Sequence, residues 1–150
     1  MKLCEVLRKD HIALKVPARD WAEAVTEAGC LLVRTGAVES RYVPAMLGVI
    51  KELGPYVVIA PGVAMPHARP EDGVNETSLG IVTLVRPVDF GNPANDPVDI
   101  VIPLAAKDHD THIDVLKELA SFLGNEENVR ALREARTADE VLDLISKGTD

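Results

Sequence analysis

Two nearly unbroken apolar stretches set the architecture of this chain: Leu79–Val85 (LGIVTLV) and Asp99–Leu104 (DIVIPL). Their β-branched residues favour strands, and runs without polar alternation are typical of strands that are covered on both faces. A loop rich in glycine, proline and asparagine, residues 91–97, separates the two stretches. We therefore expect both stretches to lie inside a sheet that has helices packed on its two sides.

Further strand and helix patterns precede and follow these two stretches. Short apolar strand patterns occur at Ile12–Val16, Tyr56–Ala60 and Val63–Met65. Helical patterns occur at Leu3–Lys9, Asp20–Arg34, Ser40–Glu52, Thr111–Leu123, Glu126–Ala135 and beyond Thr137. This order predicts an α/β fold in which a mixed β-sheet is flanked by helices on both faces. The length of 150 residues and the lack of a linker-like segment predict a single domain, residues 1–150.

The composition is that of a soluble globular protein, with 47% apolar and 27% charged residues. The net charge of −8 and the aromatic content of 3% do not suit a nucleic-acid surface, so no nucleic acid is expected as a partner. The sequence contains neither a run of about 18 apolar residues nor an apolar signal region near Met1. We therefore expect no membrane insertion and a cytoplasmic location.

Three residues outside any motif carry purely structural expectations. Cys4 and Cys30 stand far apart, in no metal-binding or redox spacing, and are expected to be small buried thiols. His11 follows a lysine and an aspartate and is expected in a solvated turn.

His67 lies in a proline-rich segment, residues 61–70 (PGVAMPHARP), that follows a strand pattern. Prolines at three positions of this segment fix the backbone φ angle and remove amide donors, which predicts a rigid loop. Such a loop can hold a reactive side chain at the surface, and Arg69 adds a cation suited to an anion such as phosphate. On these features alone, a plain surface histidine in a turn is an equally good interpretation.

Two further histidines, His109 and His112, occur in residues 108–112 (DHDTH) at a predicted helix start. Their spacing, with aspartates between them, could be read as a set of metal ligands. No cysteine pair and no His-Glu-x-x-His helix supports such a site, so no metal is expected. A polar helix start that Asp110 or Thr111 caps is the favoured interpretation.

The segment 61–70 resembles the active-site segment of enzyme IIA components of the sugar phosphotransferase system (PTS), in the mannitol/fructose class. Four further segments match that class in order and spacing: Pro87–Gly91, Asp96–Val101, Leu104–Ala106 and Thr111–Leu116. The resemblance covers about residues 3–145, and Ala68–Val74 looks most like the ascorbate-type branch. It implies the mannitol/fructose-type PTS IIA fold for this α/β domain.

The resemblance implies a phosphotransferase that forms a phosphohistidine. In this family a carrier protein, HPr, donates a phosphoryl group to a histidine of IIA, which passes it to a cysteine of enzyme IIB for uptake through the membrane enzyme IIC. The acceptor position corresponds to His67, and the family's supporting second histidine corresponds to His112. An arginine that mannitol-type members use corresponds to Lys51, so either Lys51 or Arg69 is expected to contact the phosphate. Histidine-to-histidine transfer needs neither a metal nor a nucleotide, so no cofactor is expected.

Two other functions remain open from the sequence. One is a nitrogen-related regulatory IIA-like module, which binds target proteins according to its phosphorylation state. The other is a metal-dependent hydrolase that uses His67, His109 and His112.

The surface around His67 has to serve both HPr and IIB, because each must bring a reactive atom within about 3.5 Å of the acceptor. Val63 and Met65, which precede His67, are expected to be exposed apolar residues at the centre of this surface. An acidic rim is expected from Glu71, Asp72, Asp108 and Asp110. A merely solvated helix start is the alternative for the last two of these.

Overall fold

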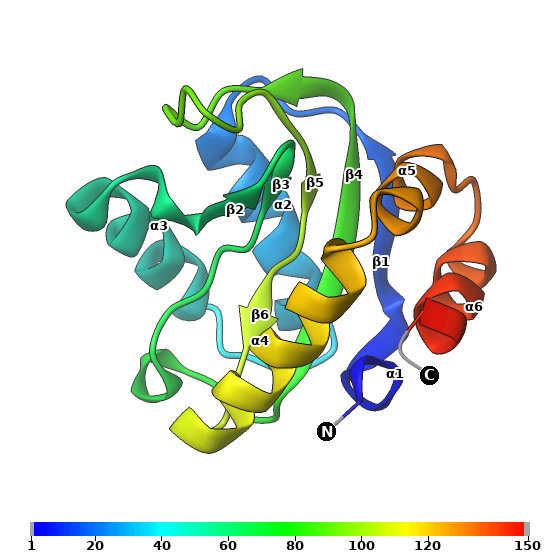
Figure 1. Cartoon of the computed structure of the whole chain (residues 1–150). Coiled ribbons are helices and arrows are strands. Elements are labelled where there is room, and N and C mark those ends of the chain that lie inside the picture. Colours follow the sequence, from blue (N-terminus) through cyan, green and yellow to red (C-terminus); the bar gives the residue numbers. More distant parts are fainter. Residues whose placement is uncertain (1, 149–150) are drawn as a thin grey trace.

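The computed structural model describes residues 2–148 and has a mixed sheet at its centre (Figure 1). Its strands are β1 (Leu7–Val16), β2 (Val58–Ala60), β3 (Val63–Ala64), β4 (Ser78–Val88), β5 (Val98–Val101) and β6 (Leu104–Ala105). They follow the order β1-β4-β5-β3-β2, and β6 pairs with β4. β1 runs parallel to β4 and β3 runs parallel to β5, whereas the other pairs are antiparallel. The mixed sheet predicted from the sequence is confirmed.

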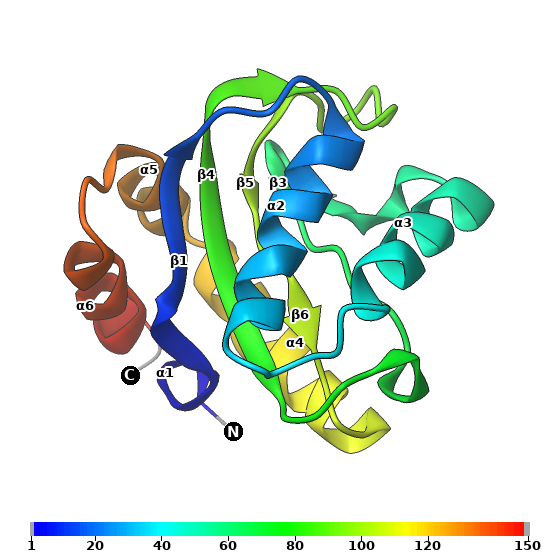
Figure 2. The same cartoon turned by 180° about the vertical axis from the view of Figure 1, so that it is seen from behind.

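Helices cover both faces of this sheet, as the two opposite views show (Figures 1 and 2). They are α1 (Leu3–Val6), α2 (Trp21–Arg34), α3 (Tyr42–Leu53), α4 (His109–Leu123), α5 (Glu126–Glu134) and α6 (Ala138–Gly148), with short 3-10 turns η1 (Pro55–Val57) and η2 (Pro70–Asp72). α2 and α3 share one hydrophobic core with the sheet, and α1, α4, α5 and α6 share the other. None of the helices within residues 2–148 is long and apolar enough to cross a lipid bilayer.

Alternate residues of β4 enter these two different cores. Leu79 and Ile81 pack with the side chains of α1, α4, α5 and α6. Val82 and Leu84 pack with those of α2 and α3. Successive side chains of a strand point to opposite faces of the sheet, so an apolar run without polar alternation buries both faces. The predicted arrangement of helices on both sides of the apolar stretches is confirmed.

The N-terminal segment departs from its predicted helix, Leu3–Lys9. Helix α1 ends at Val6, and the chain continues as β1 from Leu7, whose Cα partner across the sheet is Leu79. Pairing with β4 outweighs the local helical pattern, because tertiary contacts routinely override weak helix propensity.

Three side chains of β1, α1 and α2 differ in burial from what the sequence predicts. His11 is fully buried in β1 instead of lying in a solvated turn. Cys4 is exposed, because α1 turns Leu3 and Val6 into the core and leaves the thiol outside. Cys30 is only half-buried on α2. The expectation of two buried thiols is therefore wrong.

Pro103 divides the predicted strand Asp99–Leu104 into β5 and β6, because proline has no N–H for the strand ladder. Its carbonyl oxygen accepts a hydrogen bond from the Gly80 N–H at 3.0 Å. A Cβ at Gly80 would lie only 2.9 Å from Pro103 Cγ, so this close approach requires glycine. The chain thus brings Leu104 beside the loop after β3, where it forms an isolated parallel bridge with His67.

Candidate functional site

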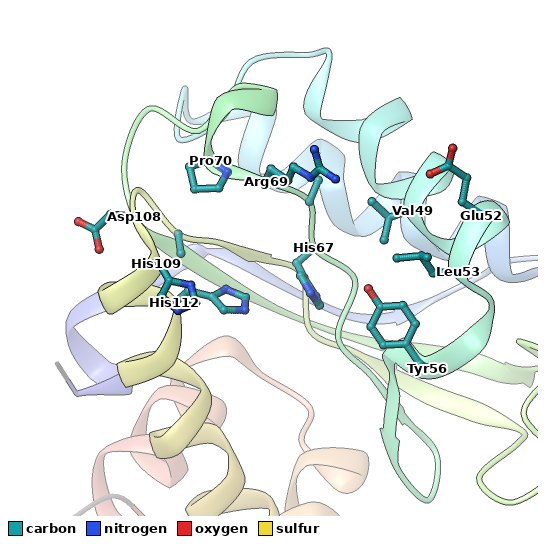
Figure 3. A pocket seen from close by; sticks show the side chains of 12 residues that line it. Val49, Glu52, Leu53, Tyr56, His67, Arg69, Pro70, Asp108, His109 and His112 are labelled. Carbon is teal, nitrogen blue, oxygen red and sulfur yellow. The ribbon is translucent and has the colours of Figure 1, made fainter.

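Three parts of the chain meet around a cavity of about 290 Å³ (Figure 3). The end of α3 and the turn η1 form one side, the loop after β3 forms the floor, and the start of α4 forms the other side. Five of the residues that the sequence marks as candidates line this cavity: His67, Arg69, Asp108, His109 and His112.

His67 is half-buried, and its ring has a defined hydrogen bond. The Nδ1 atom lies 2.9 Å from the carbonyl oxygen of Met65. A carbonyl oxygen can only accept, so in this contact Nδ1 carries the proton, and in the neutral ring Nε2 keeps its lone pair. The ring of Tyr56 stands edge-on to His67, with ring centroids 6.5 Å apart. The geometry thus presents one potentially nucleophilic ring nitrogen.

The ring of His112 lies beside that of His67 in the cavity, with ring centroids 5.2 Å apart and planes tilted by 50°. Its pKa is lowered, first by burial and then by the positive charge that His67 and His109 carry when protonated. Near neutral pH the ring of His112 is therefore uncharged, with one N–H that can donate.

Helix α4 begins at His109 because Asp108 caps it. The Asp108 carboxylate accepts from the Thr111 hydroxyl at 2.6 Å and from the Thr111 backbone N–H at 2.8 Å. These two hydrogen bonds lower the pKa of Asp108. The predicted caps, Asp110 or Thr111, are wrong, and the helix starts two residues earlier than expected. The earlier start puts His109 and His112, three residues apart, on the same face of the helix, where both line the cavity.

The two candidate cations lie in different places. Arg69 lines the cavity, and its side chain is labelled at the rim in Figure 3. Lys51 is exposed on α3 and does not line the cavity; Val49, Glu52 and Leu53 line it from that helix. The structure therefore brings Arg69, but not Lys51, together with the histidines.

The apolar surface near His67 also differs from the expected one. Val63 and Met65 are 0% and 3% exposed, because β3 lies inside the sheet between β2 and β5 and both side chains join the core. Of the four acidic residues expected at the rim, Asp72 is half-buried and the other three are exposed. Two exposed large apolar residues, Leu53 and Tyr56, line the cavity. Ile59 and Ile113 are also exposed and follow Tyr56 and His112 closely along the chain, and we call these four apolar residues the apolar rim.

The sequence patterns did not indicate that the residues of the apolar rim are exposed. Leu53 ends α3 and Tyr56 lies in η1, and both line the cavity although their pattern predicted a helix end and a strand start. Ile113 follows His112 on α4, and Ile59 lines a second, apolar groove of about 380 Å³ together with Met65 and side chains of α4. The Gly54-Pro55 break between α3 and η1 was the one signal that the chain turns here.

The interpretation of the histidines as metal ligands finds no support in the geometry. Within residues 2–148, no three His, Cys, Asp or Glu side chains are grouped so that they could hold a metal ion. His67, His109 and His112 share a cavity but do not form such a group. A half-buried imidazole with a free ring nitrogen, beside a second imidazole and an arginine, instead suits transient attachment of an anionic group such as phosphoryl.

Comparisons with known proteins agree with this class of site. Residues 5–148 match the family described as "Phosphoenolpyruvate-dependent sugar phosphotransferase system, EIIA 2". The ascorbate-specific PTS system EIIA component of Salmonella choleraesuis (strain SC-B67) is 46% identical over 149 residues, which are 98% of this chain and 97% of that protein.

Two solved structures have the same fold. One is the complex of enzyme IIA and phosphorylated enzyme IIB for mannitol from Escherichia coli, with a TM-score of 0.83, 31% identity, and coverage of 95% of this chain and 99% of that one. The other is the nitrogen regulatory protein IIA-Ntr from Neisseria meningitidis, with a TM-score of 0.81, 27% identity, and coverage of 95% and 97%.

Fold and site together define a protein that carries a phosphoryl group on a histidine. The chain belongs to the EIIA type 2 family of the phosphoenolpyruvate-dependent sugar phosphotransferase system. It is thus a phosphotransferase component with a phosphohistidine intermediate, and proteins of this kind work with an EIIB partner.

Proposed function

We propose that this chain accepts a phosphoryl group from HPr on His67 and passes it to a cysteine of EIIB, for uptake of ascorbate through a membrane EIIC. Both transfers take place in the cytoplasm. The observation that carries the proposal is the state of the His67 ring. Its Nδ1 is tied to the Met65 carbonyl at 2.9 Å, which leaves Nε2 free at a cavity that also holds His112 and Arg69.

In the first transfer, the Nε2 lone pair of His67 attacks the phosphorus of phosphorylated HPr in line with the bond that breaks. The N–P bond on HPr breaks, and its electron pair returns to the HPr imidazole as the Nε2–P bond forms. The proton on Nδ1 stays in place, so the ring of His67 gains positive charge. The Met65 carbonyl oxygen, which accepts from Nδ1, stabilises that charge.

The oxygens of the transferred group carry negative charge and need donors. Arg69 supplies a permanently charged guanidinium at the cavity. His112 supplies a neutral N–H donor, and its ring is close enough, at 5.2 Å between centroids, to reach a group bonded to His67. We assign Arg69 and His112 to phosphate stabilisation and leave Lys51 out, because it does not line the cavity.

In the second transfer, a thiolate of EIIB attacks the same phosphorus. The Nε2–P bond breaks, its electron pair returns to Nε2, and His67 leaves as the neutral ring with its Nδ1 proton unchanged. The hydrogen bond to Met65 keeps the proton on Nδ1, so the phosphorylated ring is positively charged and leaves as a neutral imidazole. A ring that leaves neutral is a better leaving group than one that leaves as an anion, so this hydrogen bond suits both transfers.

The substrate assignment is supported by the relatives. Identity with the ascorbate-specific component of Salmonella choleraesuis is 46%, and identity with the nitrogen regulatory protein of Neisseria meningitidis is 27%. The difference favours transport of ascorbate over the regulatory function, which stays the second candidate because its fold is the same.

The experiment is a reconstituted phosphoryl relay. The protein is incubated with phosphoenolpyruvate, enzyme I and HPr, and then with EIIB of an ascorbate-specific system or, as a control, EIIB of a mannitol-specific one. We expect one acid-labile phosphate on the protein and faster discharge to the ascorbate-specific EIIB.

The variant His67→Ala should accept no phosphate, whereas His112→Ala should still accept one. An unchanged phosphate yield in His67→Ala would overturn the acceptor assignment. Stable phosphorylation that neither EIIB discharges would favour the regulatory function instead.

A further inference from the structure

Tyr42, the first residue of α3, has a fully buried phenol that the transfer scheme above does not use. Its hydroxyl group lies 2.7 Å from the Leu104 carbonyl oxygen and 2.9 Å from the Ala68 backbone nitrogen. Burial raises the pKa of Tyr42 to about 12, so the phenol keeps its proton. The O–H donates to the Leu104 carbonyl, which is nearer than the Ala68 carbonyl at 3.4 Å, and the hydroxyl oxygen accepts from the N–H of Ala68.

These contacts complete a ring of hydrogen bonds around the backbone of His67. On one side, the Leu104 N–H donates to the carbonyl of Pro66 at 3.0 Å. On the other side, Leu104 is joined to Ala68 through the hydroxyl of Tyr42. Pro66 and Ala68 are the chain neighbours of His67, so the backbone before and after the histidine is tied to the same residue of β6.

We propose that Tyr42 is a positioning residue for phosphoryl transfer: its hydroxyl fixes the backbone at Ala68 and thereby holds the ring of His67 with Nε2 toward the incoming phosphorus. This inference rests on the proposed role of His67 as the acceptor. The buried phenol itself touches neither partner protein nor the phosphoryl group. A misplacement of about 1 Å can slow a reaction about 100-fold, so one buried hydroxyl is enough to affect the rate.

Packing alone does not require the hydroxyl group of Tyr42. A phenylalanine ring would fill the same part of the core, which contains Met46 and Ile50 of the same helix. What phenylalanine cannot do is donate to Leu104 and accept from Ala68. The variant Tyr42→Phe therefore removes the link on one side of His67 and keeps the core volume.

The test compares Tyr42→Phe with a matched control, Thr83→Val. Thr83 is also buried, and its hydroxyl also accepts from a backbone N–H, that of Lys15 at 3.0 Å, but it does not line the cavity. Each variant removes one buried hydroxyl group that accepts from a backbone amide, so both should lower Tm. Only Tyr42→Phe should lower kcat for phosphorylation by HPr, by about 10- to 100-fold, with an unchanged KM for HPr.

A spectroscopic readout separates positioning from stability. Nitrogen-15 spectra of the unphosphorylated protein report which ring nitrogen of His67 carries the proton. Wild type and Thr83→Val should give the Nδ1–H form, and Tyr42→Phe should give a mixture of the two tautomers. Wild-type kcat and wild-type ring shifts in Tyr42→Phe would overturn the inference, as would an equal loss of kcat in Thr83→Val. A wild-type protein that is not phosphorylated on His67 would instead refute the proposed function.

Discussion

His67 and His112 lie with their ring centroids 5.2 Å apart, yet their surroundings give them different properties. His67 shares its Nδ1 proton with a backbone carbonyl, which leaves a lone pair on Nε2. His112 has a lowered pKa because it is partly buried and faces two other imidazoles. Near neutral pH the ring of His112 is therefore an uncharged donor beside the proposed nucleophile, and it does not repel the cationic ring that phosphorylation of His67 would form.

This difference leads to a prediction for His112. The variant His112→Ala should still take up one phosphate from HPr, but about 10- to 1,000-fold more slowly, because one donor to the transition state is lost. His112→Gln keeps an uncharged N–H donor and should recover part of the rate. Rapid-quench kinetics in both directions measure this effect, and wild-type rates in His112→Ala would contradict it.

His11 supplies a prediction about stability and pH. Its Nε2 lies 2.6 Å from the Thr35 hydroxyl oxygen in the interior, and burial lowers its pKa, an effect that the charge of Asp10 partly offsets. Below a pH of about 6.5 the unfolded chain takes up a proton at this histidine before the folded chain does. The free energy of unfolding therefore falls as the pH drops through this range.

The variant His11→Gln removes the titrating group. Wild type should lose stability between about pH 7.5 and pH 5.5, and His11→Gln should lose less over the same interval. Urea denaturation at both pH values measures the two losses, and the comparison cancels the titration of all other groups. An identical pH dependence in the two proteins would show that His11 is not the group responsible.

At the level of secondary structure, helix α5 secures the short β2–β3 hairpin. Arg133 donates to the Asp99 carboxylate at 2.8 Å and to the carbonyl of Pro61 at 3.0 Å. Gly62, next to Pro61, has a φ of +76°, and a Cβ there would collide with the Arg133 guanidinium. The turn that leads into β3, and so to His67, therefore needs glycine for two reasons.

The variant Gly62→Ala should lose about 1–3 kcal/mol of stability, because alanine is strained at this φ and displaces the arginine. Gly48→Ala is a matched control in the interior of α3, where a Cβ meets no atom within 4 Å. It should gain about 0.5–1 kcal/mol, since alanine is the better helix former. Urea denaturation of both variants checks the pair, and equal effects would contradict this explanation.

The helices and strands were predictable where the signals were local. Asp20 accepts from the Glu23 N–H and caps α2, at the residue where the helical pattern Asp20–Arg34 begins. The strand over residues 7–11 was not predictable, because it depends on pairing with β4, about 70 residues away in the chain. The division of one predicted strand into β5 and β6 at Pro103 was also not predictable. A proline interrupts a strand only where its missing N–H would have bonded to a neighbouring strand, and that neighbour is known only from the fold.

For the molecule as a whole, we expect the apolar rim to be the surface that both partners of the proposed relay share. Leu53 is 65% exposed at the cavity, and Val85 is 57% exposed on β4, outside it. Leu53→Asn should raise KM for both HPr and EIIB by about 5- to 30-fold, as loss of an apolar contact at an interface centre does. Val85→Asn should change neither. Asparagine is chosen because an added carboxylate would also repel the phosphoryl group. A higher KM for only one of the two partners would contradict a shared surface.

How much of the site the sequence could predict depended on the kind of signal. His67 and Arg69 stand two residues apart in one predicted rigid loop, and His112 lies in a segment that matches the family, so the sequence could single out all three, and all three line the cavity. The side of α3 on which Lys51 lies was not predictable, because it depends on how the helix rotates when Tyr42 and Met46 enter the core. The hydroxyl link through Tyr42 has no local signature at all, since it joins parts of the chain that only the fold brings together.

The central claim is that Nε2 of His67 accepts the phosphoryl group. The most direct measurement is nitrogen-15 and phosphorus-31 NMR of the labelled protein after phosphorylation by HPr at neutral pH. We predict one phosphohistidine, with phosphorus bonded to Nε2 of His67 and a proton still on Nδ1. Phosphorus on Nδ1 of His67, or on any other histidine, would contradict the claim.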